Sequence, residues 1–448
     1  MDGGGHEERI LPEPGGRDEE KGSRRAVLAA LLALLVLLLG AAGEALADST
    51  LTLPRGVGRL RVRPIYSFIS ERWNERGDAE LLTGDLNNRN LNSDVFSDLS
   101  TLERLYDYRA RSLSLGTSQV ESQLHIFVLA LAGEYGITDR LTLGLVVPIV
   151  HARHLLRRLD LDRVRVCNDQ QCGVGTNPGD TNITKSDARY LPLDHDKDPD
   201  TKLLAPLTKD DVLDILDDDF GYQRLQDWSD TGVGDIELGL KYRILTWRYW
   251  ATSVQGGLRI PTGKLANPNN LLAVDFGDGQ TDIGLYWQND FTPTRAMRLN
   301  LTLRYTAQLP DFRFKRVPPR ADVPVSKKTD VENVWRDPGD VFEVDCSVAY
   351  TFRGVLTPYA GYLFTLKGQD DVRGNRGLSY RSLMDETALR NHQLEAGLLF
   401  STLPWVVSGR TRVPLMITLS YSRSLAGINN AAISNTLALD MAGYFKVL

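Results

Sequence analysis

The sequence predicts a twelve-stranded antiparallel transmembrane β-barrel with short periplasmic turns and long outer loops. Twelve segments alternate apolar and polar side chains with the two-residue period of a strand. An export signal precedes them. The connections alternate long and short, as in outer-membrane barrels, which also have an even strand number. The long connections are 71–118, 155–228, 261–280, 309–340, 368–391 and 424–434.

The first 47 residues have the features of a secretory signal. Two arginines, Arg24 and Arg25, precede the apolar run 26–43, and Ala45-Leu46-Ala47 is a small-x-small cleavage site. We therefore expect residues 1–47 to be removed as a signal peptide and 48–448 to form the barrel. Retention of the run as a membrane anchor is the alternative, because 18 apolar residues are just enough to span a bilayer.

The sequence shows with differing clarity which face of each of the first three strand segments is polar and which is apolar. In 59–70, arginines alternate with apolar side chains, which indicates one polar and one apolar face. Segment 123–135 is apolar on both faces, so its orientation stays open. The third segment is 141–150, and the loop that follows it, about 155–228, is the longest in the chain.

The fourth segment, 235–244, carries the clearest pattern. Every even-numbered side chain is large and apolar, and every odd-numbered one is charged or glycine. A wall between lipid and a wet lumen requires this alternation. The same period continues through 253–260, 282–291, 298–307, 342–352, 357–367, 393–401, 413–422 and 436–447.

Charge and composition exclude some partners. Residues 1–47 hold eight acids and five bases, so they carry −3 of the net −6, and the remainder also carries −3. This balance is too mild to indicate nucleic-acid binding. The slightly polar mean hydropathy of −0.24 suits strands that alternate.

The charged side chains on the polar faces are the candidate functional residues. They could line a wet pore that orients a polar or amphipathic solute. They could equally form an internal ion-pair network that props the wall and blocks passage. These lumen-lining candidates are Arg59, Arg61, Arg63, Asp235, Glu237, Lys241, Arg243, Arg259, Asp282, Arg298, Arg304, Glu343, Asp345, Glu395 and Asp440.

Two loop segments read as short helices that could enter the barrel mouth. Residues 97–106 start with a capping serine and repeat leucine at helical spacing, and 207–217 is an amphipathic, acid-rich segment. Either helix could plug the mouth or decorate the outer surface, and the sequence does not decide between these positions.

Cysteine and acidic residues suggest two further sites. Cys167 and Cys172 lie close together in a polar loop and are expected to form a disulfide in an oxidising compartment, whereas Cys346 reads as a wall residue. The acidic loop 194–219 resembles a calcium loop, but its sixth and twelfth positions are Pro199 and Ala205. We expect a solvated acidic loop, no metal and no cofactor, with calcium binding as the alternative.

An outer-membrane hydrolase is the enzymatic alternative. It would need a nucleophile beside a positioned base. His125 is the single histidine in the middle of a predicted strand, with Ser122 nearby, and no G-x-S-x-G motif is present. We therefore expect no catalysis.

Four stretches together resemble a family of bacterial outer-membrane, transporter-like proteins associated with the phenol meta-cleavage pathway. They are 134–145, which reads EYGITDRLTLGL, 232–242 (GVGDIELGLKY), 257–263 (GLRIPTG) and 279–285 (GQTDIGL). The resemblance covers about residue 133 to the C-terminus. It implies passage of small, often aromatic or hydrophobic compounds across the outer membrane of a Gram-negative bacterium.

The expected function is therefore a channel or transporter for passive passage of small molecules, with the lipid bilayer and a small solute as partners. A structural or partner-binding barrel that acts through its long acidic loops is the alternative. The sequence leaves open a homo-oligomer, a surface partner and whether the pore is open.

Overall fold

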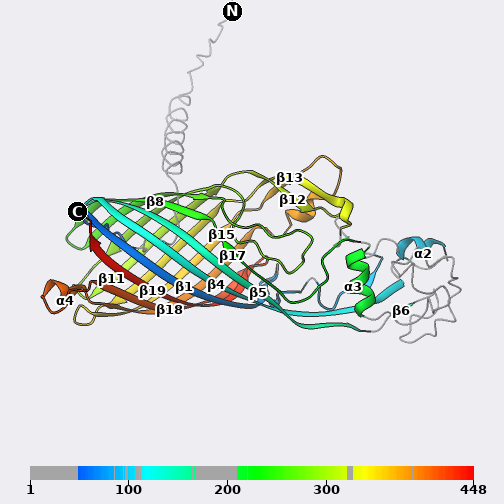
Figure 1. Ribbon diagram of the computed structural model, residues 1–448, viewed down its shortest axis with the longest axis horizontal. Coiled ribbons are helices and arrows are strands. Elements are labelled where there is room, and N and C mark those ends of the chain that lie inside the picture. The colour runs from blue at the N-terminus through cyan, green and yellow to red at the C-terminus, as the bar shows by residue number, and fades with distance from the viewer. Residues whose placement is uncertain are drawn as a thin grey trace, which may run out of the picture.

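Twelve strands of the chain close into one antiparallel barrel (Figure 1). The computed structural model describes residues 49–84, 86–93, 95, 99–105, 110, 113–162, 165–166, 209–218, 220–319, 326–385 and 387–447. Strand β1 pairs with both β4 and β19, which closes the ring and confirms the predicted fold class. The ring runs β1 (Val57–Trp73), β4 (Leu113–Thr138), β5 (Leu141–Asp162), β8 (Ile236–Trp247), β9 (Trp250–Ile260), β10 (Asp282–Phe291), β11 (Met297–Gln308), β14 (Val341–Tyr350), β15 (Leu356–Lys367), β17 (Leu389–Ser401), β18 (Leu415–Ile428) and β19 (Ala432–Lys446).

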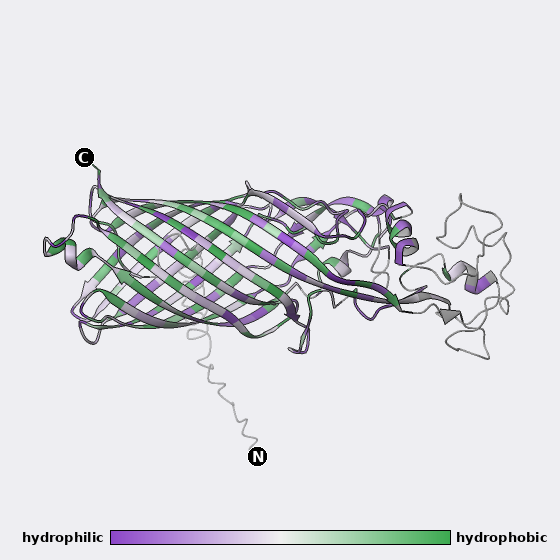
Figure 2. Ribbon diagram, turned by 60° about the horizontal axis from the view of Figure 1, so that its bottom comes forward, coloured by the Kyte–Doolittle hydropathy of each residue, from purple (hydrophilic) through white to green (hydrophobic). Residues whose placement is uncertain are grey.

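The wall is apolar outside and polar inside. On β8, Leu238, Leu240 and Tyr242 are exposed on the outer face, whereas Lys241 between them is only 2% exposed. Figure 2 shows the resulting alternation of hydrophobic and hydrophilic residues along the strands. This is the inverse of a water-soluble protein, and it places the apolar face against lipid acyl chains.

The strands match the predicted segments closely except on the outer side of β4 and β5. Strand β10 has the predicted bounds, and most of the others differ by a few residues. The hairpin of β4 and β5 continues well beyond the barrel, into residues that the sequence assigned to loops. Alternation is irregular there because these strands meet other loops instead of lipid.

The long loops contain further structure at the outer end of the barrel. Helix α3 packs Leu213 against Val120 on the β4 extension, together with Leu225 and Leu272. Among the described residues, no helix is both long and apolar enough to cross a membrane. The loop elements are β2 (Ala79–Leu81), β3 (Asn90–Asn92), α2 (Leu99–Leu105), β6 (Arg165–Val166), α3 (Lys209–Asp218), β7 (Trp228–Val233), β12 (Asp311–Arg316), η3 (Lys328–Asp330), β13 (Val331–Asp337), β16 (Asp371–Arg373) and η4 (Tyr380–Leu383).

Helices α2 and α3 occupy the two segments for which the sequence predicted helices, 97–106 and 207–217. Helix α3 packs on the outward extension of the wall. Strands β12, β13 and β16 form a separate three-stranded sheet that the sequence did not predict. A short helix, α4 (Leu403–Val407), lies in the turn between β17 and β18, at the same end of the barrel as the C-terminus (Figure 1).

Candidate functional site in the barrel lumen

A cavity of about 340 Å³ lies inside the barrel and has two chemically different sides. The side made by strands β1, β4 and β5 is mainly apolar but also carries Arg61 and Arg63 of β1; its apolar residues are Ile65, Val128, Ala130, Ala132, Val146 and Pro148. Strands β8 to β14 contribute a mainly polar side, which includes Glu237, Arg259, Tyr286, Arg304 and Glu343. A molecule in this cavity would therefore contact hydrocarbon on one flank and charged groups on the other.

The first group of charges joins β1 to its two neighbours. Arg59 and Arg61 both form ion pairs with Glu134 on β4, and Arg61 also pairs with Asp440 on β19. The Glu134 side chain has no exposed surface. Glu134 was not among the residues predicted from the sequence, although it is the one acid in segment 123–135 and arginines in the lumen need a counter-charge.

The second group lies on the opposite wall. Arg259 forms ion pairs with Glu237 at 3.2 Å and Asp282 at 2.9 Å, and with Asp278 of an outer loop at 3.2 Å. The three carboxylates surround the guanidinium group of Arg259, whose side chain is one-third exposed.

Arg304 on β11 makes a third cluster next to it. Its guanidinium pairs with Asp345 at 2.8 Å and Glu343 at 3.4 Å, both on β14. The same group lies 5.7 Å from the ring centroid of the buried Tyr286, within range of a cation–π contact. Arg304 is thus held from three directions and faces the cavity.

The other lumen candidates occupy different positions. Arg63 lines the cavity, and Glu395 accepts a hydrogen bond from the Tyr359 hydroxyl at 2.7 Å. Arg243 donates to the Asp139 carbonyl in a short turn, at the periplasmic rim.

Arg298, by contrast, has an exposed side chain at the periplasmic end of β11. Asp235 lies just before β8 at the outer end and accepts hydrogen bonds from the backbone N–H groups of Gly263 and Asp278, both at 2.8 Å. Asp235 therefore anchors a loop in the outer mouth.

The segment that precedes β1 crosses the periplasmic end of the lumen. The backbone N–H and the hydroxyl of Thr50 donate to Asp290 on β10, at 2.9 and 2.7 Å. Lys241 donates to the carbonyl of Ser49 at 2.7 Å, and the N–H of Leu53 donates to Thr142 at 2.8 Å. Residues 49–53 therefore lie across the periplasmic end of the lumen, and we call them the N-terminal strap.

Close packing at one glycine lets the strap turn into β1. A Cβ atom at Gly136 would lie 2.1 Å from the Pro54 carbonyl oxygen, so no larger residue fits there. The two helices predicted as possible plugs lie in the outer loops, and the strap was not predicted from the sequence. A short extended segment without periodicity carries no signal of where it will pack.

The outer mouth is covered by the loop between β9 and β10. Arg313 on β12 pairs with Asp275 of that loop. Arg336 on β13 donates to the Asp278 carbonyl at 2.8 Å and to Asp311 at 3.0 Å. The small outer sheet thus ties this loop over the lumen, and the cavity is restricted at both ends.

A buried serine–histidine pair lies under the same loop. Ser122 and His154 are hydrogen-bonded at 2.8 Å through Nε2, and Nδ1 of His154 is 2.9 Å from the Leu272 carbonyl oxygen. His125, the histidine that the sequence singled out, is bonded to Tyr66 on the outer face instead. The backbone carbonyl takes the place of the carboxylate that orients a catalytic histidine, and Ser122 is only 3% exposed. The pair therefore holds the loop in place.

Acidification should loosen this loop. Burial lowers the pKa of His154 below its ordinary value of 6.5, and the hydrogen bond to Leu272 opposes the shift. The unfolded chain then binds the proton more readily than the folded one, so the stabilising contribution is complete above about pH 6.5 and is lost as the pH falls through the lowered value. We expect lower amide-exchange protection factors around Leu272 at pH 5 than at pH 7.5, after correction for the intrinsic pH dependence of exchange. His154→Gln should remove most of that difference, and an unchanged difference would contradict the assignment.

Some predicted sites lie outside the described residues. These are the signal peptide at 1–47, Cys167 and Cys172, and most of the acidic loop 194–219. Cys346 is exposed on the outer face of β14. In the part of the chain that the structure describes, no group of three or more His, Cys, Asp or Glu side chains could hold a metal ion.

Comparisons with known proteins show the fold. No family model and no curated protein matches the chain. Among solved structures, an outer membrane channel from Pseudomonas putida F1 has a TM-score of 0.50 and 12% identity, over 90% of this chain and 100% of that chain. A deletion mutant of the monoaromatic hydrocarbon channel TodX has a TM-score of 0.32 and 9% identity, over 88% and 91%. A FadL homologue from Pseudomonas aeruginosa has a TM-score of 0.32 and 8% identity, over 88% of this chain and 90% of that chain.

The first of these structures carries the likeness, because its full length aligns with most of this chain. The chain thus has the β-barrel fold of an outer-membrane channel. At 12% identity the likeness extends to the fold alone, so the solute must be argued from the lumen.

Proposed function

We propose that the chain is an outer-membrane channel for small amphipathic molecules, each with an apolar or aromatic body and a polar or anionic group. The two-sided cavity is the observation that carries the proposal. A wholly apolar solute would leave the charged side unsolvated, and a fully polar one would gain nothing from the apolar side.

The charges facing the cavity favour an anionic group on the solute. Four arginines but only two glutamates line the cavity itself. The other carboxylates that pair with these arginines are not among the lining residues; they are Glu134, Asp278, Asp282, Asp345 and Asp440. Phenols and aromatic carboxylates fit this combination, and the sequence resemblance to transporter-like proteins of phenol degradation supports the same class of solute.

Conductance of the refolded mature chain in a planar bilayer tests the proposal. We expect small, discrete open steps with a preference for anions, reduced by millimolar benzoate or another small aromatic carboxylate. Arg259→Glu should lower the anion preference, and Glu343→Lys should raise it, because both groups face the cavity.

Several outcomes distinguish the alternatives. Open steps that are insensitive to both substitutions would place the ion path elsewhere and contradict the proposed site. An inserted barrel that stays silent, and that still does not pass aromatic carboxylates into vesicles, would favour a structural or partner-binding barrel. Ester hydrolysis that disappears in Ser122→Ala would instead favour the hydrolase.

A further inference from the structure

The outer wall of β5 changes from apolar to basic where the strand leaves the lipid-facing band. Ile149 is exposed and apolar, and the next outward-facing residues, His151 and Arg153, are exposed and polar. On β4, His125 lies directly opposite Arg153. Arg153 and Arg157 both lie within electrostatic range of His125. His151 precedes Arg153 by two residues on the same outward face of β5. We call His125, His151, Arg153 and Arg157 the basic patch.

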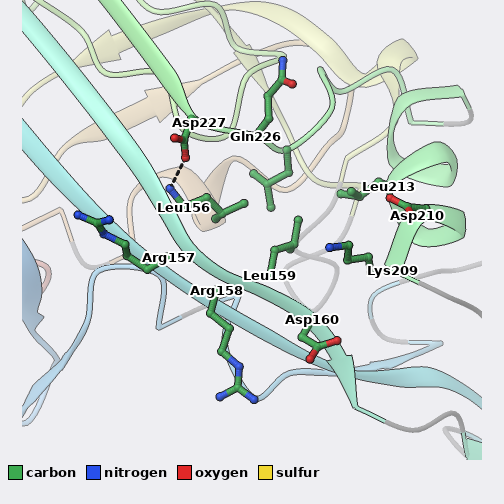
Figure 3. A pocket seen from close by; sticks show the side chains of 11 residues that line it. Leu156, Arg157, Arg158, Leu159, Asp160, Lys209, Asp210, Leu213, Gln226 and Asp227 are labelled. Carbon is green, nitrogen blue, oxygen red and sulfur yellow. Dashed lines mark hydrogen bonds between the residues drawn. The ribbon is translucent and has the colours of Figure 1, made fainter.

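The carboxylates near the patch are engaged elsewhere. Glu121 pairs with Arg158 at 3.7 Å, and Asp230 pairs with Lys264 at 2.6 Å. Asp227 accepts the N–H of Leu156 at 2.8 Å, which is the dashed line in Figure 3. Within the described residues, no ion pair joins Arg153 or Arg157 to an acid.

The patch lies on the outside of the wall and does not face the mouth. Figure 3 shows the Arg157 side chain on the side of β5 away from α3, whereas Leu159 and Leu213 lie between β5 and α3. Arg157 donates to Gln123 at 2.7 Å, and His151 is bonded to Thr231 of β7 at 2.8 Å. These contacts fix the direction of both side chains on the outer surface.

Aromatic side chains place the patch at the outer boundary of the membrane. The Tyr66 hydroxyl is 2.6 Å from Nδ1 of His125, and the Phe68 ring lies 5.2 Å from the His125 ring. Tyr362, His392 and Phe364 repeat this arrangement, with corresponding distances of 2.6 and 5.0 Å. Aromatic rings with a polar end gather at the level of lipid headgroups.

We propose that the basic patch binds the phosphate group of a phosphorylated glycolipid in the outer leaflet. Arginine forms bidentate hydrogen bonds with phosphate, and arginines at this level meet the headgroups without leaving the wall. Directly below, Ile149 and Val233 are paired across β5 and β7 and are exposed, so they can contact the acyl chains of the same lipid. A free anion would gain nothing from the apolar surface of Ile149 and Val233, and a solute in the lumen would not reach it.

Native mass spectrometry of the detergent-solubilised full chain with added diphosphorylated lipid A tests the proposal. We expect wild-type protein to retain the lipid and Arg153→Gln/Arg157→Gln to lose about tenfold or more in apparent affinity. The matched control is Arg248→Gln/Arg295→Gln, which removes two exposed arginines at the opposite end of the barrel and should retain the lipid. Lipid A without phosphate should bind weakly to every variant.

Equal retention of phosphorylated and dephosphorylated lipid A would overturn the proposal, as would equal retention by the patch variant and the wild type. Displacement by millimolar inorganic phosphate would show a site for free anions and would also overturn it. Arg153→Lys/Arg157→Lys keeps the charge but loses the bidentate geometry, so we expect an intermediate loss of lipid affinity. This variant replaces the glutamine variant in the test if the glutamine variant fails to insert. Lipid binding needs no ion flow, so a silent channel would leave this inference intact.

Discussion

A chain that lacks Ser49 to Leu53 should conduct several times more than the wild type. Removing the N-terminal strap takes away the contacts to Asp290, Lys241 and Thr142 that hold it across the periplasmic end. The lumen would then be restricted only by the outer loop. Single-channel recording of the refolded proteins measures the difference.

A point substitution can release the strap without shortening the chain, so it tests whether the higher conductance comes from release of the strap. Asp290→Ala removes the acceptor of two hydrogen bonds from Thr50, and a buried hydrogen bond to a charged group contributes about 2 kcal/mol. It should therefore produce brief openings to the conductance of the shortened chain. Arg410→Ala, in the exposed turn before β18, is the control and should conduct like the wild type. Equal conductance of the shortened and full chains would show that the strap does not block the path.

Arg304→Met should destabilise the barrel strongly and also change its ion selectivity. Glu343 and Asp345 would keep their charges in the lumen without the guanidinium that now pairs with both. Breaking a buried ion pair on one side costs about 3–5 kcal/mol, because the remaining charge is left uncompensated. We expect a lower thermal unfolding temperature and a shift toward cation selectivity.

Arg298→Met provides the matched control on the same strand. Its side chain is exposed at the periplasmic end, so the substitution should change stability little. The triple variant Arg304→Met/Glu343→Gln/Asp345→Asn should regain part of the lost stability, because it removes the uncompensated charges as well. A loss as large in Arg298→Met as in Arg304→Met would contradict the role given to the internal ion pairs.

The sequence predicts the wall well because the wall is periodic. Each lipid-facing residue must be apolar and each lumen-facing residue can be polar, so a segment such as 282–291 can be located without its neighbours. The β4 segment was harder to orient, because Ala130 and Ala132 line the apolar side of the cavity and erase the alternation. The inward-facing alanines that make the orientation of β4 ambiguous in the sequence are therefore part of the candidate site.

The contacts across the lumen could not be predicted in this way. The pairing of Arg61 with Asp440 follows from barrel closure, which brings the first and last strands together. Thr50 and Asp290 meet only because the strap turns inward at Pro54. Such contacts form only when the barrel closes in three dimensions, so the local pattern of the sequence does not predict them.

The strap also constrains the order in which the protein can assemble. Val57 pairs with Lys446, so the ring cannot close before nearly the whole chain has been delivered to the membrane. The hydrogen bond between Thr50 and Asp290 joins residues that are 240 positions apart in the sequence. Contacts of such long sequence separation form slowly. We therefore expect seating of the strap to be a late step of assembly, which can be followed separately from insertion.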